Sequence, residues 1–569
     1  MDGSQNAQEG GPHNEQRQEA PPEQQDIQGS WDPPSPSLLE LPLDGIEAIG
    51  APLSFKDRIR LTSCCRTLRA RTLSSRHLWG SLQLNLYAMP PAYFDSLAAW
   101  LAAHKGGLHA LHIAPSPQLK GEGAVVSRLL HSVVGGTLAA LELSHILCQI
   151  PFKAPASDDF APLACLTALT SLTLGGRAFP VLPSELSALR RLKTANFEAM
   201  CSFNPGTWAP LSHLTAVTSL AMGCGLVRNL PPQLAACTAL LELLVNEHAL
   251  LLGYDSSDEP HAYDPLQHLT ALTKFEGPCA PAGLELLATS LRELRPTCQF
   301  FAPGEPNLAS ISRLTALTRL DLSAAIMHVF PIGLSACGAL RELVMHRARL
   351  PELPEAAFQP LAHLTALTHL SLREVRLAAV PPALAAATGL LELALNPQYI
   401  NEDGHFIRLV PELGHLSRLS SLTRLQRLEL WDPSTRRLPA QLSTLQNLTS
   451  LVLDGCKAMA QGGDAAFEPL RHMTAMRNLH LESMVLQALP SQVSALSSLR
   501  TLDLAYNPGL ASADPSTWLL LLSLCFLRTL NLAFCEIDSV PAALAPLKTA
   551  GVQLRIGCWP YGRALDGSD

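Results

Sequence analysis

The 569-residue chain lacks the short motifs that commonly carry enzyme chemistry. It contains no G-x-x-x-x-G-K-S/T phosphate loop, no G-x-S-x-G nucleophile elbow and no H-E-x-x-H zinc motif. No C-x-x-C pair is present to bind zinc, and the 14 cysteines show no disulfide framework. We therefore expect a protein that is not an enzyme, uses no metal or cofactor, and is kept in a reducing compartment.

Aromatic residues and unbalanced charge are also scarce. Aromatic residues make up 5% of the chain, and residues 1–37 contribute seven acids and one arginine to the net charge of −8. The nearly neutral remainder argues against non-specific binding to nucleic acid. The longest apolar stretch, Trp518–Phe526, is far shorter than the ~20 residues that span a bilayer, and Met1–Gly11 has no signal-peptide pattern. We expect a cytoplasmic or nuclear protein that binds neither nucleic acid nor membrane.

The sequence is rich in leucine at regular spacing. The phrase Leu166-Thr-Ala-Leu-Thr-Ser-Leu-Thr-Leu174 follows an L-x-x-L-x-x-L-x-L pattern. This pattern returns at Leu214–Met222, Leu314–Leu322, Leu364–Leu372, Leu422–Leu430, Leu445–Leu453, Leu496–Leu504 and Leu524–Leu532. A second phrase, an apolar residue followed by proline, alternates with it at Pro183, Pro231, Pro331, Pro381, Pro439, Pro490 and Pro541. Self-similarity of this kind predicts a repeat protein.

The two phrases resemble the leucine-rich-repeat family, the L-P-x-x-L subtype in particular, over residues 108–556. The resemblance implies an α/β solenoid, or horseshoe, in which each L-x-L is a half-buried strand. One unit cannot bury its own leucines, but stacked neighbours can, at roughly 1.5–3 kcal/mol for each buried Leu. Chains of this kind usually serve as surfaces for protein–protein interaction.

The intervals between units indicate a larger repeat of about fifty residues, made by duplicating a pair of units. Within clear pairs the strand leucines lie 23 residues apart, while the intervals between pairs are longer. The long gap before Leu317 predicts a degenerate unit at Leu291-x-x-Leu294. Two insertions, Asn246–Pro265 and Asn396–Glu412, predict long loops on one rim of the solenoid.

The buried asparagine of the family is expected two residues beyond the strand phrase, where it can satisfy backbone groups at the turn. Asn507 fits this position, and Cys456 and Cys535 are accepted substitutes. Upstream the position holds other residues, such as Val375. The sequence therefore predicts turn bonding of this kind for the last repeats and leaves it open for the central ones.

The stretch before the repeats has a pattern of its own. It contains Leu41-Pro-Leu-Asp-Gly-Ile46 and Leu53-Ser-Phe-Lys-Asp-Arg-Ile-Arg-Leu61, and it closes with Leu78-Trp79. Its apolar spacing is typical of two or three short amphipathic helices, and the whole resembles the F-box. The resemblance implies docking to the adaptor protein of a cullin–RING ubiquitin ligase, and thereby to its cullin. The residues that would form or support this adaptor-binding surface are Leu41, Pro42, Ile46, Ile49, Leu53, Ile59, Leu61 and Cys65.

Three features depart from the F-box pattern: Gly45 and Leu68 stand where it has an aliphatic residue and a tryptophan, and Gly50-Ala51-Pro52 is an unusual helix ending. A helical cap that only shields the end of the solenoid is the alternative for this segment. Apolar spacing over Pro91–His104 predicts a helix that links it to the repeats. The expected organisation is a disordered acidic tail (1–37), an F-box-like helical module (38–86), a linking helix (87–107), the solenoid (108–556) and a C-terminal tail (557–569).

Side chains that flank the buried strand leucines are expected on the concave face of such a solenoid. Early repeats place small residues there, such as Ser171 and Ala221, whereas central repeats place mixed charges and a lone tryptophan. Arg and Trp are enriched among interface anchors. The predicted substrate-binding residues are Arg319, His346, His369, Arg373, Asn396, Arg427, Glu429, Trp431 and His480.

Four of the 19 histidines share a repeated phrase, P-L-x-H followed by Leu or Met and Thr. They are His213, His268, His363 and His472. With strands spaced ~4.8 Å apart, units two or more repeats apart place them about 10 Å or more from one another, too far to share a metal ion. We expect them to be repeat-derived residues on the flank of the solenoid.

These patterns together predict a substrate-receptor subunit of a cullin–RING (SCF-type) ubiquitin ligase. The helical module would hold the ligase, while the concave face or the loop rim holds a protein substrate near the conjugating enzyme. The alternative is an interaction scaffold without ligase contact, of a regulatory, cytoskeletal or ciliary axoneme-associated kind.

Overall fold

The computed structural model divides the chain into two compact units, Met1–Leu78 and Trp79–Asp569, which are described separately. The residues that the structure describes are 43, 57–58, 60, 64, 66, 70, 72, 75–86, 93–114, 122–143, 157–175, 182–202, 205–224, 230–247, 264–277, 284–296, 310–323, 330–346, 355–375, 377, 379–396, 415–537 and 539–557.

The described positions of the first unit between 57 and 72 are helical. The Arg58 guanidinium donates a hydrogen bond of 2.5 Å to the carbonyl of Leu78, 20 residues along the chain. The backbone N–H of Leu78 donates to the Ser75 hydroxyl at 3.1 Å. The first bond links Arg58 to helix α4 (Arg76–Trp79), and the second lies at the start of that helix.

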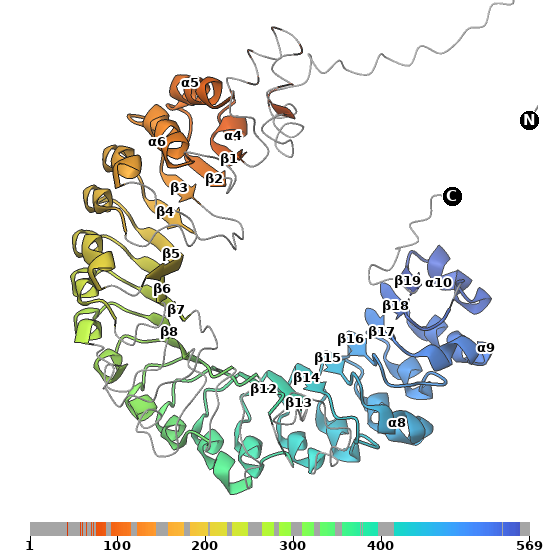
Figure 1. Cartoon of the computed structure of the whole chain (residues 1–569). Helices are drawn as coiled ribbons and strands as arrows, with labels where there is room; N and C mark the ends of the chain where they lie inside the picture. Colours follow the sequence, from red (N-terminus) through yellow and green to blue (C-terminus); the bar gives the residue numbers. More distant parts are fainter. Residues whose placement is uncertain are drawn as a thin grey trace, which may run out of the picture. The chain divides into compact units, whose positions relative to one another are not determined.

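In the described residues of the second unit, 19 strands form one parallel sheet. Each strand pairs with the next one along the chain, so the repeats stack in sequence order (Figure 1). The strands are β1 Ser81–Asn85, β2 Ala110–Ala114, β3 Ala140–Leu143, β4 Ser171–Leu174, β5 Thr194–Ser202, β6 Ser219–Cys224, β7 Glu242–Glu247, β8 Lys274–Gly277, β9 Glu293–Pro296, β10 Arg319–Asp321, β11 Glu342–Val344, β12 His369–Arg373, β13 Glu392–Asn396, β14 Arg427–Leu430, β15 Ser450–Val452, β16 Asn478–His480, β17 Thr501–Asp503, β18 Thr529–Ala533 and β19 Gln553–Gly557.

The register of the strands explains why the leucine spacing is so regular. Leu320 of β10 lies beside Leu343 of β11, which lies beside Leu370 of β12, and all three side chains are buried. Because successive strand residues point to opposite faces, one face of the sheet is a wall of leucine and the other carries polar residues. The order of strands and the repeated burial make the second unit a leucine-rich-repeat solenoid, as the sequence predicted.

The return segments opposite the sheet are mostly 3₁₀ helices, which lie outside the strand layer in Figure 1. They are η3 Ser157–Cys165, η4 Ser184–Ala188, η5 Pro205–His213, η6 Pro232–Ala236, η7 Asp264–His268, η8 Glu285–Leu287, η10 Ser310–Arg313, η11 Ile332–Ala336, η12 Glu355–His363, η13 Pro382–Ala386, η14 Leu416–Ser421, η15 Ala440–Thr444, η16 Gly463–His472, η17 Ser491–Ala495, η18 Pro508–Ser512, η19 Leu520–Ser523 and η20 Ala542–Leu544.

The prolines of the second sequence phrase begin these helices. Pro331 caps η11, and its carbonyl accepts from the N–H of Leu334 at 3.2 Å. Proline suits this position because its φ is already fixed near the value a turn needs and it has no N–H to leave unpaired. The same place is occupied by Pro183, Pro231, Pro381, Pro439, Pro490 and Pro541.

A few α-helices replace or extend the 3₁₀ turns. In α5 (Phe94–His104), which lies where the linking helix was expected, the side chains of Phe94, Leu97 and Leu101 are buried. Tyr93 is 60% exposed because it lies just before the first helical turn. The α-helices described in the second unit are α5 Phe94–His104, α6 Glu122–Val133, α8 Lys457–Gln461, α9 Pro515–Leu519 and α10 Ala545–Thr549.

The sheet starts one strand earlier than the leucine phrases suggested. The first repeat strand was expected at Leu108–Ile113, but β1 already pairs in parallel with β2 and aligns Leu82 with Leu111. Further along, the degenerate unit predicted at Leu294 is confirmed, since β9 pairs with both β8 and β10. The two long insertions lie, for most of their length, outside the described residues.

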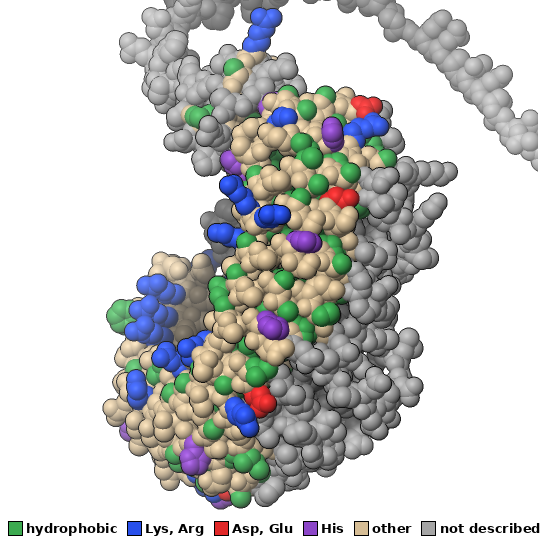
Figure 2. All heavy atoms as spheres, turned by 90° about the vertical axis from the view of Figure 1, so that its left-hand side faces the viewer, with side chains coloured by type: hydrophobic (Ala, Val, Ile, Leu, Met, Phe, Trp, Pro, Cys, Tyr) green, Lys and Arg blue, Asp and Glu red, His purple; other side chains and the backbone are tan. Residues whose placement is uncertain are grey.

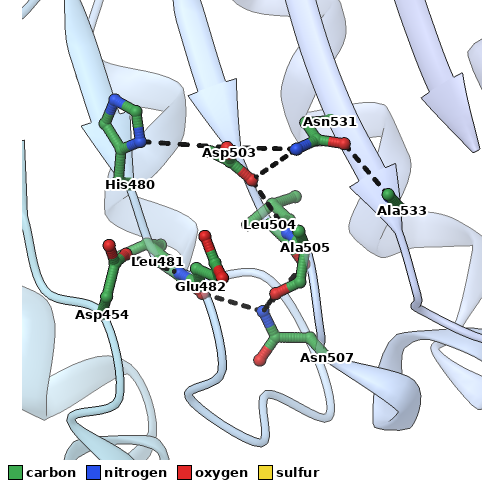
Figure 3. Close-up of polar contacts among 10 residues, drawn as sticks. All are labelled: Asp454, His480, Leu481, Glu482, Asp503, Leu504, Ala505, Asn507, Asn531 and Ala533. Atoms are coloured by element: carbon green, nitrogen blue, oxygen red, sulfur yellow. Dashed lines mark hydrogen bonds and ion pairs between the residues drawn. The ribbon is translucent and has the colours of Figure 1, made fainter. Parts of the chain in front are cut away.

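Asn507 confirms the predicted buried position of the last repeats. Its side-chain oxygen accepts from the N–H groups of Met484 at 3.1 Å and Leu486 at 3.0 Å. Its amide nitrogen lies 2.8 Å from the carbonyl oxygens of both Leu481 and Leu504 (Figure 3). Two adjacent turns are thereby satisfied by one side chain.

The predicted cysteine substitutes each make one of the hydrogen bonds to turn carbonyls that asparagine makes at this position. The thiol of Cys535 donates to the carbonyl of Leu504 at 3.0 Å, and that of Cys456 donates to the carbonyl of Leu430 at 3.6 Å. Burial raises the pKa of the Cys456 thiol to about 12 and that of Cys535 to about 11. Both therefore remain thiols that donate, and neither is a reactive nucleophile.

A threonine at the start of many strands binds the preceding repeat. The Thr318 hydroxyl donates to the carbonyl of Arg292 at 3.0 Å, in addition to the backbone bonds of the ladder. The same bond to the preceding strand is made by Thr170, Thr218, Thr273, Thr368 and Thr449.

Within the described residues, no helix is both long and apolar enough to cross a membrane.

Candidate functional site

The predicted substrate-binding residues lie on or directly after strands β10 to β14 and β16. Arg319 and Arg427 are exposed, and the other side chains are partly covered by their neighbours. Asn396 is 7% exposed, so it offers little surface to a partner. The polar face of the sheet, which we call the concave face, is where these residues come together.

Several charges on the concave face from β8 to β11 are paired with the neighbouring strand. Arg295 lies between two acids, 2.9 Å from Glu276 and 3.5 Å from Asp321. Arg319 lies 3.1 Å from Glu342. Exposed pairs of this kind contribute at most about 1 kcal/mol each to stability. They keep the surface polar and hydrated, and a partner's charged groups can replace either member.

A second cluster joins β12 to β14. The Arg373 guanidinium lies 2.5 Å from the Glu429 carboxylate, and Arg427 lies 3.9 Å from the same group. The arginine reaches across β13, where the residue paired with Glu429 is Ala394, whose methyl group leaves the path open. Within this cluster the His346 ring lies 2.7 Å from the Ser371 hydroxyl, and burial, followed by the Arg373 charge, lowers the pKa of His346.

Beyond β14 the charged groups described on the concave face are mainly carboxylates. Asp454 accepts from the backbone N–H of Glu482 at 3.0 Å, which brings their carboxylates to the same rim of the sheet (Figure 3). Burial raises the pKa of Asp454 to about 6, and the charges of Asp503 and Glu429 act in the same direction. Burial, followed by the charges of Asp454 and Asp503, also raises the pKa of Glu482.

Asp503 is the third carboxylate of this acidic end of the concave face, which also includes Asp454 and Glu482. Its two carboxylate oxygens accept from the Asn531 amide at 3.0 and 3.1 Å, and the His480 ring lies 3.9 Å away. Its Oδ1 also accepts from the backbone N–H of Ala505 at 3.0 Å. The inward positions of β15 to β18 include no lysine or arginine, so these carboxylates lack a strong cationic neighbour on their own strands.

Trp431, the tryptophan predicted as an anchor, lies against the next repeat. A Cβ added to Gly455 would sit 2.0 Å from the indole nitrogen, so the ring packs directly on that glycine's backbone. Gly455 also has a φ of +71°, which L side chains rarely adopt. The indole is half-buried, so only part of it is available to a partner.

The eight predicted adaptor-binding residues all lie outside the described residues: Leu41, Pro42, Ile46, Ile49, Leu53, Ile59, Leu61 and Cys65. Their neighbours Arg60, Cys64 and Arg66 are helical and exposed. The docking surface is therefore a sequence-based prediction.

The repeated histidines end the 3₁₀ helices η5, η7, η12 and η16, and all four are exposed. Figure 2 shows part of the outer face, where histidine side chains stand apart from one another. Among the described residues, no group of three or more His, Cys, Asp or Glu side chains is placed to hold a metal ion. The geometry of the described part fits binding through many separate polar contacts.

Sequence reasoning missed the acidic end of the concave face as a unit. His480 was among the predicted substrate-binding residues, whereas the roles of Asp454, Glu482 and Asp503 depend on neighbours one and two repeats away. It also missed Tyr506 and Phe534, which lie two residues after the last leucine of their repeats and are not part of the leucine pattern. The sequence did offer one signal: Tyr506 and Phe534 stand at a turn position where another repeat has a glycine, Gly455.

Comparison with known proteins identifies no matching family model and no matching curated protein. Similar solved structures include a leucine-rich-repeat protein of Leptospira interrogans, with 17% identity and a TM-score of 0.45 over 80% of this chain and 97% of that one. An internalin of Listeria monocytogenes has 16% identity and a TM-score of 0.40 over 68% of this chain and 94% of that one. The TLR13–ssRNA13 complex has 17% identity and a TM-score of 0.48 over 80% and 62%. At these levels the likeness concerns the repeat fold only.

Proposed function

We propose that the chain is a non-catalytic recognition subunit: its concave face binds a protein, and its N-terminal module docks it to a cullin–RING ubiquitin ligase. The observation that carries recognition is the concave face itself. Exposed Arg319 and Arg427 and the half-buried Trp431 lie on one continuous sheet, within reach of a single bound surface. Such residues are typical interface anchors.

The charge pattern further supports a protein as the partner. Positive and negative groups alternate from β8 to β14, and the carboxylates of Asp454, Glu482 and Asp503 follow. A polyanion such as nucleic acid would meet as many acids as bases along this surface. A folded protein or peptide with its own mixed charges is the complementary partner.

The ligase part of the proposal rests on the F-box resemblance of residues 41–79 and on the helical state of the described positions in that stretch. In this arrangement the ligase core supplies the chemistry. The chain raises the effective concentration of the substrate lysine near the conjugating enzyme. The competing function is an interaction scaffold that has the same concave face and no ligase contact.

Co-purification of the full chain with the ligase adaptor separates these two functions. The double variant Ile46→Asp, Ile59→Asp places charge on the predicted apolar docking surface and should abolish binding. A matched control, Arg60→Asp with Arg66→Asp, puts the same carboxylates at exposed positions of the same module. Binding by the parent and control, with loss in a folded double variant, supports the receptor. No binding by the folded parent contradicts it and favours the scaffold.

A further inference from the structure

The last repeats share an unusual turn directly after the strand. Gly455, Ser483, Tyr506 and Phe534 have φ between +56° and +71°, and Gly557 has φ +115°. Each of the first four donates its backbone N–H to the following repeat, with acceptors on Glu482, Ala505, Ala533 and Gly557 at 2.8 to 3.0 Å. The five residues therefore occupy one continuous row along the rim of the sheet.

Two members of this row are aromatic although the turn favours glycine. The rings of Tyr506 and Phe534 are stacked, with centroids 4.4 Å apart and planes 8° from parallel. Tyr506 is 45% exposed. A bulky side chain in the left-handed region is strained, and glycine fills the same turn without strain at Gly455 and Gly557. The backbone does not require rings here, and strain held at a surface position is a reason to look for function.

The surroundings of this aromatic ledge, defined as Tyr506 and Phe534, are acidic on one side. Glu482 immediately precedes Ser483 in the row, and Asp503 lies three residues before Tyr506. Neither the ion pairs nor the side-chain hydrogen bonds among the described residues include the Glu482 carboxylate. Ala505 and Ala533, which precede the two rings, are small and buried.

We propose that the aromatic ledge, together with Glu482 and Asp503, binds an arginine-bearing segment of a protein partner. A guanidinium is planar, so it stacks on an aromatic face while its N–H groups donate to carboxylates. A lysine offers a point charge that matches only the acidic half of the surface. The proposal deepens the recognition role proposed above and rests on it, because it assigns a chemical class to part of the bound partner.

Fluorescence anisotropy of the purified full chain with a short capped peptide of alternating glycine and arginine tests this directly. The matching citrulline peptide has side chains of the same shape without the positive charge. A lysine peptide has the positive charge without the planar guanidinium group. The parent should bind the arginine peptide about tenfold more tightly than the citrulline peptide, and several-fold more tightly than the lysine peptide.

The double variant Tyr506→Gly, Phe534→Gly should weaken arginine-peptide binding about tenfold without lowering the melting temperature, since glycine suits the turn. Ser483→Gly is the matched control, with the same backbone change and no ring, and should bind like the parent. Glu482→Gln provides a second test that leaves the turns untouched, and it should weaken binding several-fold.

Equal binding of the arginine and citrulline peptides would overturn the proposal. So would undiminished binding by both the folded double variant and Glu482→Gln, because the peptide would then be held elsewhere on an acidic protein. These results are independent of adaptor docking, which depends on the N-terminal module. If the chain binds the arginine peptide at the ledge but does not bind the adaptor, the result supports the ledge proposal and contradicts only the proposed docking to the ligase.

Discussion

Replacing Asn507 with leucine should be among the most damaging single changes to the last repeats. The side chain is 0% exposed and bonds to backbone groups of two successive turns. Leucine has nearly the same size but neither donates nor accepts. The N–H groups of Met484 and Leu486 and the carbonyl groups of Leu481 and Leu504 would then lose a partner inside the protein.

The expected magnitude follows from these lost bonds. Leaving one buried polar group unpaired costs about 1–3 kcal/mol. The Leu504 carbonyl keeps the Cys535 thiol as a donor, so three groups would be left unpaired, and the turns can relax and admit water. We therefore expect the free energy of unfolding to fall by about 3–5 kcal/mol, at the upper end for point substitutions.

Urea denaturation followed by circular dichroism, with amide hydrogen exchange at residues 481–507, measures both the loss and its location. Asn507→Cys is the matched control, because Cys456 and Cys535 occupy the equivalent place in neighbouring repeats and donate one bond each. It should lose roughly half as much as the leucine variant. A loss below about 1 kcal/mol for Asn507→Leu would refute the bonding argument.

Three further changes test other parts of the structure. Gly455→Ala should destabilise by about 2–4 kcal/mol in a thermal melt, because its Cβ meets Trp431 and its φ is positive. Thr318→Val should cost about 1 kcal/mol in urea by losing the bond to Arg292. The folded pKa of Asp454, about 6, lies above its ordinary 3.8, so ionisation opposes folding as pH rises through 6. Asp454→Asn should therefore stabilise by about 1 kcal/mol at pH 8, after allowance for solvent screening, and change nothing near pH 3.

The fold was predictable because the same physical demand recurs in every unit. Each strand must bury leucine against its neighbours, so a weak unit such as that around Leu294 can be located from the spacing of stronger ones. The proline phrase and Asn507 were predictable for the same reason, since each satisfies a backbone requirement of one turn. Ser81–Asn85 was harder, because β1 belongs to the sheet by pairing and lacks the full leucine phrase.

The concave face was predictable in position but not in detail. Alternation along a strand tells which side chains face inward, and it placed Arg319, Arg373 and Glu429 on one surface. It cannot tell that Arg373 reaches over β13, because that depends on Ala394 being small. Likewise, the burial of Asn396 depends on its packing in the folded chain.

The central claim is that the concave face, and not the outer face, recognises a protein partner. Proximity labelling in cells, quantified by mass spectrometry, tests it with two matched double variants. Arg319→Ser with Arg427→Ser removes exposed arginines from the concave face, and Arg313→Ser with Arg471→Ser removes exposed, ion-paired arginines from the outer helices. The account predicts that labelled partners fall with the first variant and persist with the second, at equal melting temperature. Partners that persist with the first variant and fall with the second would contradict it.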